Sequence, residues 1–424
     1  MNERIAVIYL DGLNSLNAPM SARELAKYLS RALEHKAGTR TARFVLGKQR
    51  LVRYGQEGRY EAPVQTLLRM DGTATTGEVD IYRVDYLSSL VERLRNRSPA
   101  LRIVMLCLNL LQQSLSLLRA CLRRGTSRLK FFDLAVASGW VVLVLADLLF
   151  VVSGMVSADW LQEHVHLASA AAAQWIDAVV PGFVSSTGIV GSKAAIQVWV
   201  GAHLGALLLS GGSARTRLSS ATAGYGAMLE YVMRGEGRSA ATAHVPNLLE
   251  QLDNDEVVYD EIHLMGYSFG SIVALDTVFP AARTRDKAID ELSSVTTIGC
   301  PLEACVAIVP KYFHQRYQTT ATSRWTNVYL DRDPLSTTPP PERTGVTGRG
   351  VRLAEGNGER RPHYDIDGRE WGKQINVGVV ATFLLGGMRV HSAYWEEDSD
   401  APSCFDPLVV RLFENRTVSI RSTS

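Results

Sequence analysis

The sequence predicts an α/β protein in which a mostly parallel sheet is flanked by helices and interrupted by an apolar helical insertion. Short apolar runs alternate with amphipathic segments over residues 1–97, and the same alternation returns over residues 218–424. The block between them, residues 98–217, is far more apolar than either flank. We therefore expect residues 1–97 and 218–424 to be the two parts of one core, and residues 98–217 to be an insertion between them.

The first part of the core has the order strand, helix, strand. Residues 5–10 are an apolar run of strand length. Ser21 and Glu24 have the spacing of a capping box, and apolar residues recur behind them at helical spacing. Residues 44–55 are broken by basic residues and glycine and give no clear prediction, whereas residues 79–86 have the pattern of a strand. This order is typical of an open sheet with parallel strands.

Two apolar runs in the insertion predict a transmembrane hairpin. Leu134–Met155 contains one carboxylate, Asp147, and as a helix it would be about 33 Å long, enough for a hydrocarbon core of about 30 Å. Ala194–Leu209 is uncharged but shorter, so it would cross only with help from its neighbours. Leu101–Leu122 has polar interruptions and predicts an amphipathic helix, interfacial or buried, because a third crossing would separate the two parts of the core. The alternative for the whole insertion is a soluble lid or cap of buried helices.

The charges around the hairpin predict its orientation. Basic residues lie beyond both outer ends, whereas the loop between the runs carries three carboxylates and one lysine. The outer basic residues are Arg123, Arg124, Arg128, Lys130, Arg215 and Arg217. By the positive-inside rule both outer ends stay in the cytoplasm. Residues 1–7 lack the pattern of a secretory signal peptide. We therefore expect a multi-pass membrane protein whose catalytic part lies on the cytoplasmic side.

Charge and cysteine content limit the classes of function. The formal net charge is +2, and nothing in this balance indicates a nucleic-acid partner. The five cysteines are scattered, without a C-x-x-C pair or a histidine-rich cluster, which predicts reduced thiols and no metal site. Reduced thiols agree with a cytoplasmic location of the catalytic part.

Gly266-Tyr-Ser-Phe-Gly270 is the motif around which the candidate chemistry is organised. An apolar run that begins at Val257 precedes it, and Ile272–Leu275 reads as the start of a buried helix. A strand that turns so tightly into a helix needs small residues beside the central position, and it holds the serine in a strained turn with its hydroxyl pointing out of the sheet. The helix N-terminus also favours negative charge there. Ser268 is therefore the candidate nucleophile, and the alternative is an ordinary turn with a capping serine.

A serine nucleophile needs an adjacent base, and the base needs a third group that orients it. In open α/β sheets such groups collect at the carboxyl ends of strands. Asp333 follows the predicted strand 325–330, and His391 follows a later apolar run, in the order nucleophile, acid, histidine. Several alternatives remain open on the sequence alone. Asp331 is the alternative acid, Asp365 and Asp367 are more distant ones, His363 is the rival base, and His263 is expected to be a packed side chain.

These motifs make the chain resemble an α/β-hydrolase of the serine lipase and esterase type. The residues that carry the resemblance are Gly266-Tyr-Ser-Phe-Gly270, Asn327-Val-Tyr-Leu-Asp-Arg-Asp-Pro334 and His391-Ser-Ala-Tyr-Trp395. The resemblance covers about residues 1–97 and 218–424. It implies that Ser268 is the nucleophile, Asp333 the orienting acid and His391 the general base.

An oxyanion hole is also implied, because the tetrahedral intermediate of acyl transfer needs two backbone N–H donors. One is expected at Phe269, and the other in the loop after the first strand, at Gly12 or Leu13. Many relatives have His-Gly at that point, whereas this chain has Asp11-Gly12. The departure keeps the glycine but puts a carboxylate near the site.

The expected function is a membrane-anchored serine hydrolase that cleaves a carboxylic ester through an acyl-enzyme on Ser268, without a cofactor. A lipid ester is favoured because an anchor raises the effective concentration of the site at the bilayer. The expected partners are therefore an acyl-ester substrate and the membrane, with homo-oligomers left open. One alternative is a membrane effector or sensor in which the hairpin oligomerises or perturbs the bilayer and the hydrolase fold is regulatory. Another is a soluble esterase with an apolar cap.

Overall fold

The structure is a computed structural model. It describes residues 3–13, 20–37, 42–95, 99–123, 212–255, 258–280, 286–312 and 324–329, together with residues 333, 335–337, 363–365, 393–395, 404–405 and 408–409. The predicted transmembrane hairpin, about 134–155 and 194–209, lies outside these residues, and so do Asp331 and His391.

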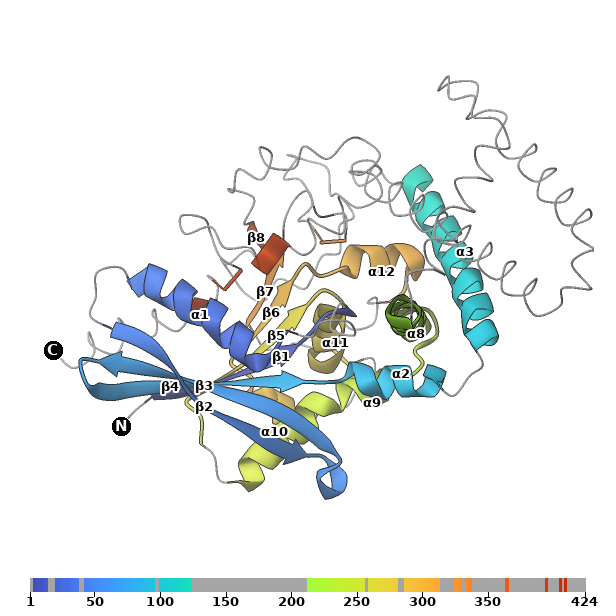
Figure 1. Cartoon of the computed structure of the whole chain (residues 1–424). Helices are drawn as coiled ribbons and strands as arrows, with labels where there is room; N and C mark the ends of the chain where they lie inside the picture. Colours follow the sequence, from blue (N-terminus) through green and yellow to red (C-terminus); the bar gives the residue numbers. More distant parts are fainter. Residues whose placement is uncertain are drawn as a thin grey trace, which may run out of the picture.

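An eight-stranded sheet forms the centre of the molecule, in the order β2-β3-β4-β1-β5-β6-β7-β8 (Figure 1). The strands are β1 (Glu3–Leu10), β2 (Ala42–Tyr54), β3 (Tyr60–Asp71), β4 (Ala74–Val84), β5 (Glu261–Tyr267), β6 (Ser294–Ile298), β7 (Arg324–Tyr329) and β8 (His363–Asp365). Strands β4, β1, β5, β6, β7 and β8 pair in parallel, and β2, β3 and β4 pair antiparallel. The α/β class and the mostly parallel sheet that the sequence predicts are confirmed.

Helices cover both faces of the sheet. They are α1 (Ala22–Ala37), α2 (Leu87–Arg95), α3 (Pro99–Arg123), α8 (Gly212–Arg234), α9 (Arg238–Thr242), α10 (His244–Asn254), α11 (Phe269–Val278) and α12 (Leu302–Ile308). Alternate residues of β1 enter different cores, as a strand buried on both faces requires. Val7 packs in the cluster that contains Leu25 of α1, and Ile8 packs in the cluster that contains Ile272 of α11. The site at the end of β1 therefore stands on a sheet that is packed from both sides.

The predicted capping box at the start of α1 is confirmed. The Ser21 hydroxyl accepts from the Glu24 N–H at 3.1 Å, and the Glu24 carboxylate accepts from the Ser21 N–H and hydroxyl, both at 2.8 Å. These bonds from Ser21 lower the pKa of Glu24. Two N–H groups at the start of the helix are satisfied reciprocally in this way.

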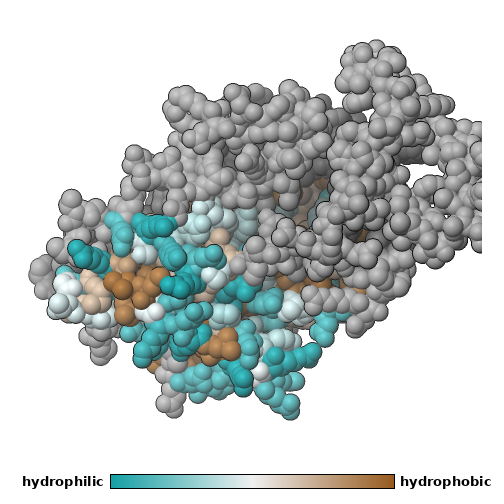
Figure 2. All heavy atoms as spheres, in the orientation of Figure 1, coloured by the Kyte–Doolittle hydropathy of each residue, from teal (hydrophilic) through white to brown (hydrophobic). Residues whose placement is uncertain are grey.

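Strands β2 and β3 form a long antiparallel hairpin at one edge of the sheet. Its surface in Figure 2 is mainly hydrophilic with separate apolar patches. Val45 and Leu51 are the exposed large apolar residues of β2. Isolated exposed apolar residues of this kind are common on soluble surfaces.

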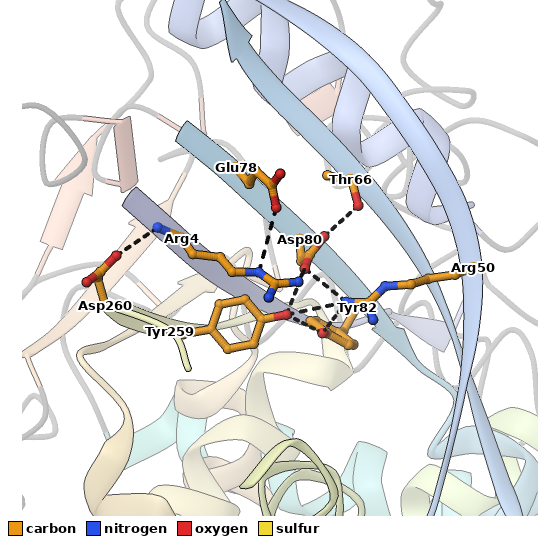
Figure 3. A network of polar contacts seen from close by, with 8 residues as sticks. All are labelled: Arg4, Arg50, Thr66, Glu78, Asp80, Tyr82, Tyr259 and Asp260. Carbon is orange, nitrogen blue, oxygen red and sulfur yellow. Dashed lines mark hydrogen bonds and ion pairs between the residues drawn. The ribbon is translucent and has the colours of Figure 1, made fainter. Parts of the chain in front are cut away.

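A buried carboxylate joins this hairpin to the middle of the sheet (Figure 3). Asp80 of β4 accepts from Thr66 of β3 at 2.6 Å and from Tyr259, just before β5, at 2.7 Å. It also forms ion pairs with Arg50 of β2 at 2.9 Å and Arg4 of β1 at 3.2 Å. The side chain is almost inaccessible to solvent, so these partners replace the water that the charge would lose on burial.

Helix α3 lies at the start of the predicted insertion, and α8 runs from its last residues into the second part of the core. Leu106 and Leu110 of α3 pack with Leu229 of α8 in a small cluster of their own. The helix expected over residues 101–122 is present as α3, which buries one side between residues 106 and 117. Among the helices that the structure describes, none combines the length and hydropathy needed to cross a membrane.

Candidate active site

Ser268 lies in a sharp turn between β5 and α11. Its backbone has φ 54° and ψ −123°, outside the regions that L-residues normally occupy. Such a conformation costs about 1–3 kcal/mol and persists only where the surroundings hold it. The Ser268 N–H donates to the carbonyl of Ile298 in β6 at 2.8 Å, and the Ser271 hydroxyl donates to the Gly266 carbonyl at 2.7 Å. The structure thus holds a strained strand-to-helix turn with the candidate nucleophile at its tip.

The two glycines of the motif are required by backbone contacts. A Cβ on Gly266 would lie 2.7 Å from the Gly270 carbonyl oxygen. A Cβ on Gly270 would lie 2.2 Å from the carbonyl oxygen of Leu10, the last residue of β1. Real Cβ atoms do not approach so closely, and in both cases the neighbour is main chain and cannot rotate away. The small residues predicted on either side of the serine are thus needed for α11 to start against the end of β1.

Gly12 brings the loop after β1 against the candidate nucleophile. A Cβ on this residue would lie 2.9 Å from the Cβ of Ser268 and 3.0 Å from the ring of Tyr267. The loop after β1 therefore approaches the turn at Ser268 closely, and the glycine at position 12 permits this.

Asp11 is buried, and its carboxylate closes the same loop instead of standing free. Oδ1 accepts from the Gly12 N–H at 2.8 Å and from the Tyr9 hydroxyl at 3.0 Å, and Oδ2 accepts from the Met20 N–H at 3.1 Å. Burial raises the pKa of Asp11, although these bonds act in the opposite direction. The carboxylate thus bonds to backbone N–H groups on both sides of residues 14–19.

This arrangement bears on the predicted oxyanion donors. Phe269 directly follows Ser268 at the first position of α11, and its ring is fixed against Tyr231 with the centroids 5.2 Å apart. Gly12 donates its N–H to Asp11, so of the two predicted loop donors Leu13 is the better candidate. The bond from Gly12 to its own neighbour could not be foreseen from the sequence pattern.

Asp333 is completely buried beyond the carboxyl end of β7. Its Oδ1 accepts from the Leu335 N–H at 2.9 Å, and its Oδ2 accepts from the Tyr394 hydroxyl at 2.9 Å. The turn is tied to the end of β6, because the N–H and the hydroxyl of Thr337 both donate to the Cys300 carbonyl at 2.8 Å. Residues 335–337, at the start of a stretch whose composition indicates a loop, are thus fixed against the sheet.

The third motif reaches the site through the residues that follow His391. Tyr394, three positions later, donates to Asp333, and its ring centroid lies 6.2 Å from that of Tyr267. The Trp395 ring centroid is 5.1 Å from that of Tyr267, the residue before Ser268. Segments of all three motifs therefore meet at one end of the sheet. The positions of the His391 imidazole and of the alternative acid Asp331 lie outside the described residues.

The other candidates are placed as follows. His263 is buried in β5, with Nδ1 2.8 Å from the Ser294 hydroxyl and Nε2 3.0 Å from the Glu261 carboxylate, and the prediction of a packed side chain is confirmed. His363 and Asp365 are the first and last residues of β8, the edge strand that pairs with β7. Asp367 lies outside the described residues.

Tyr394 entered the sequence analysis only as part of the third motif, and its bond to Asp333 was not expected. Its position close behind His391 was the only signal for a role at the site. Within the part of the chain that the structure describes, no group of three or more His, Cys, Asp or Glu side chains gathers in a way that would hold a metal ion.

Comparisons with known proteins add no identification: no family model matches the chain, and no match was found among curated proteins or among solved structures. The candidate site is therefore interpreted from its own geometry.

Proposed function

We propose that this protein is a serine hydrolase of the α/β-hydrolase type, and that Ser268 is the nucleophile with which it cleaves a carboxylic ester. The observation that carries the proposal is the strained turn at Ser268, which two sterically required glycines flank and against which Gly12 packs. An ordinary capping serine would need neither the positive φ nor the tight approach of a second loop.

In the proposed reaction the Ser268 hydroxyl attacks the acyl carbonyl while His391 takes its proton. Asp333 orients the imidazole and stabilises its charged form. The N–H groups of Phe269 and Leu13 are the proposed donors to the oxyanion. Collapse of the intermediate expels the alcohol, which takes the proton from His391. Water then attacks the acyl-enzyme with His391 as base, and the Ser268 oxygen leaves and takes the proton back. The burial of Asp333 and its bond to Tyr394 support this assignment, because they fix the carboxylate close to the segment that carries His391.

A lipid ester is the proposed substrate class. This part of the proposal rests on the predicted hairpin of residues 134–155 and 194–209, which would hold the core at the cytoplasmic face of a membrane. A tethered site meets bilayer substrates at a high effective concentration.

The nucleophile is tested with Ser268→Ala in the full-length protein. We expect labelling by a fluorophosphonate probe and hydrolysis of a short-chain ester to be lost, because the substitution removes the proposed attacking oxygen. Ser239→Ala, at an exposed serine of α9, is the matched control and keeps both signals. The thermal unfolding midpoint shows whether each variant is folded. If folded Ser268→Ala is still labelled and active, Ser268 is not the nucleophile.

The substrate class is tested separately by comparing the lipids of cells that carry the wild type or Ser268→Ala. Accumulation of one class of lipid ester in the variant supports a lipid substrate. Unchanged lipids, together with an active short-chain esterase, contradict it.

One observation favours the effector as a second candidate function. The N–H of Gly12, one of the two loop positions expected to supply an oxyanion donor, is bound to Asp11 in this chain. A regulatory hydrolase fold would tolerate this. An overexpression phenotype of the Ser268→Ala variant distinguishes the two candidate functions. If the wild-type phenotype survives the substitution, the membrane effector is supported; if it is lost, the serine hydrolase is supported.

A further inference from the structure

The outward face of α3 is apolar. Leu108 is 61% exposed, Leu111 49%, Leu115 48% and Leu118 42%. At 3.6 residues per turn these four side chains lie within about 80° of one another, in a stripe about 15 Å long. A helix on the surface of a soluble protein normally turns such a stripe toward the core. We call these four residues the leucine stripe.

The inward face of α3 is partly polar. Asn109 and Gln113 are only 2% and 6% exposed. Asn109 accepts from the Arg234 guanidinium at 3.4 Å, and Gln113 accepts from the Tyr225 hydroxyl at 3.3 Å. Both donors belong to α8. Polar bonds between helices, with apolar side chains turned outward, are the arrangement that helices adopt when the surrounding medium is apolar.

The charge of α3 restricts the kind of apolar medium. The helix contains no aspartate or glutamate, and its charged residues are Arg102, Arg119 and Arg123. Arg119 is exposed directly after Leu118, at the end of the leucine stripe. An apolar face with a basic residue at its border matches the boundary between acyl chains and anionic head groups.

We propose that the leucine stripe lies in the surface of a lipid bilayer, with α3 parallel to the membrane plane.

The position of α3 connects this contact to the candidate site. Its inner side packs against α12 as well as α8, and α12 begins four residues after the carboxyl end of β6 (Figure 1). The leucine stripe therefore belongs to the same end of the sheet as Ser268. Lipid contact itself does not depend on any activity; only its use in substrate access rests on the proposed function.

A fluorescent probe on the leucine stripe tests the contact in the full-length protein. Leu111→Cys is made with Cys107→Ala and Cys121→Ala, labelled with an environment-sensitive dye, and reconstituted in vesicles of phosphatidylcholine and phosphatidylserine. Some of the phosphatidylcholine carries a nitroxide quencher high on its acyl chain. We expect the emission to shift to the blue and to be quenched, because an interfacial helix buries its apolar face about 5–10 Å into the head-group boundary. Leu115→Cys gives an independent position if the first variant does not fold.

Val258→Cys, in the same cysteine background, is the matched control. Val258 is an equally apolar residue, 80% exposed, in the segment before β5 and so at the opposite end of that strand from Ser268. Its probe keeps the emission of a water-exposed dye and is not quenched. An unquenched, water-like probe at Leu111 overturns the proposal, and so does a blue-shifted probe that the nitroxide does not quench, because protein then covers the stripe.

The contact and the enzyme are tested independently. Quenching at Leu111 in the Ser268→Ala background supports the lipid contact whatever the outcome for catalysis. Changing all four leucines to glutamine should lower hydrolysis of a vesicle-borne ester relative to a water-soluble one. If hydrolysis is absent in the wild type while quenching persists, the proposed function fails and the lipid contact stands.

Discussion

At the scale of single residues, the buried carboxylate of Asp11 holds the loop that packs against Ser268. The carboxylate accepts from Tyr9, Gly12 and Met20, and Gly12 in turn packs against Ser268. A buried carboxylate with three donors is stable only while those donors stay in place. Asp11 is thus a positioning residue, which acts on the reaction through the backbone at Gly12.

We predict that Asp11→Asn lowers kcat about tenfold or more while the protein stays folded. An asparagine can place an accepting oxygen on only one side, so its NH2 group opposes either the Met20 N–H or the donors at Gly12 and Tyr9. A hydrogen bond to a charged group contributes about 1.5–3 kcal/mol, and misplacing the loop by that energy would slow the reaction about tenfold or more.

The measurement is kcat and KM for a short-chain ester, with the thermal midpoint beside them. Asp253→Asn, an exposed aspartate of α10, is the control and changes neither. An unchanged kcat in folded Asp11→Asn would show that Asp11 does not position the loop.

At the scale of elements, the end of β1 and the start of α11 are packed backbone to backbone. Gly270 allows this contact, because its missing side chain leaves room for the Leu10 carbonyl. The contact sets the distance between the loop after β1 and the turn at Ser268. Helix α11 and strand β1 must therefore form together for the site to exist.

We predict that Gly270→Ala destabilises the protein by about 1–3 kcal/mol or more, the usual cost of overpacking. Gly226→Ala is the control within α8, where the added Cβ would meet only the Leu94 side chain at 3.4 Å. It should be neutral or stabilise by up to about 1 kcal/mol, because alanine favours helix. Urea denaturation compares the two variants. Equal midpoints would contradict the role assigned to the close contact.

The Asp80 network is the second link between elements, since it joins β1, β2, β3, β4 and the segment before β5. We predict that Asp80→Ala costs about 3–5 kcal/mol, because it leaves buried donors and two arginines without their shared partner. Glu61→Ala removes an exposed ion pair with Arg53, 3.2 Å long on the same hairpin, and should cost less than about 1 kcal/mol. Chemical denaturation measures both. A small loss for Asp80→Ala would mean that the network adds little to the hairpin's attachment.

At the scale of the whole molecule, local patterns predicted the local structure and missed the contacts between distant segments. The turn at Ser268 was predictable because five consecutive residues encode it. The β2–β3 hairpin was not, because an edge strand keeps one side in water and its basic residues hide the alternation. The bond between Tyr394 and Asp333 spans 61 residues, and no local spacing encodes it. The catalytic roles assigned to Ser268, Asp333 and His391, and the oxyanion donors expected at Phe269, Gly12 and Leu13, stay predictions.

The central position of β1 has a consequence for how the chain is made. One edge of β1 pairs with β4, but the other pairs with β5, and the bond from the Arg4 N–H to Asp260 joins residues 256 positions apart. A ribosome thus completes β1 to β4 and the whole insertion before the strand that closes the sheet exists. Until then β1 offers a bare edge of unpaired amides and carbonyls, the kind of surface on which chains aggregate. Biogenesis of this protein should therefore depend on a factor that shields the nascent edge until β5 emerges.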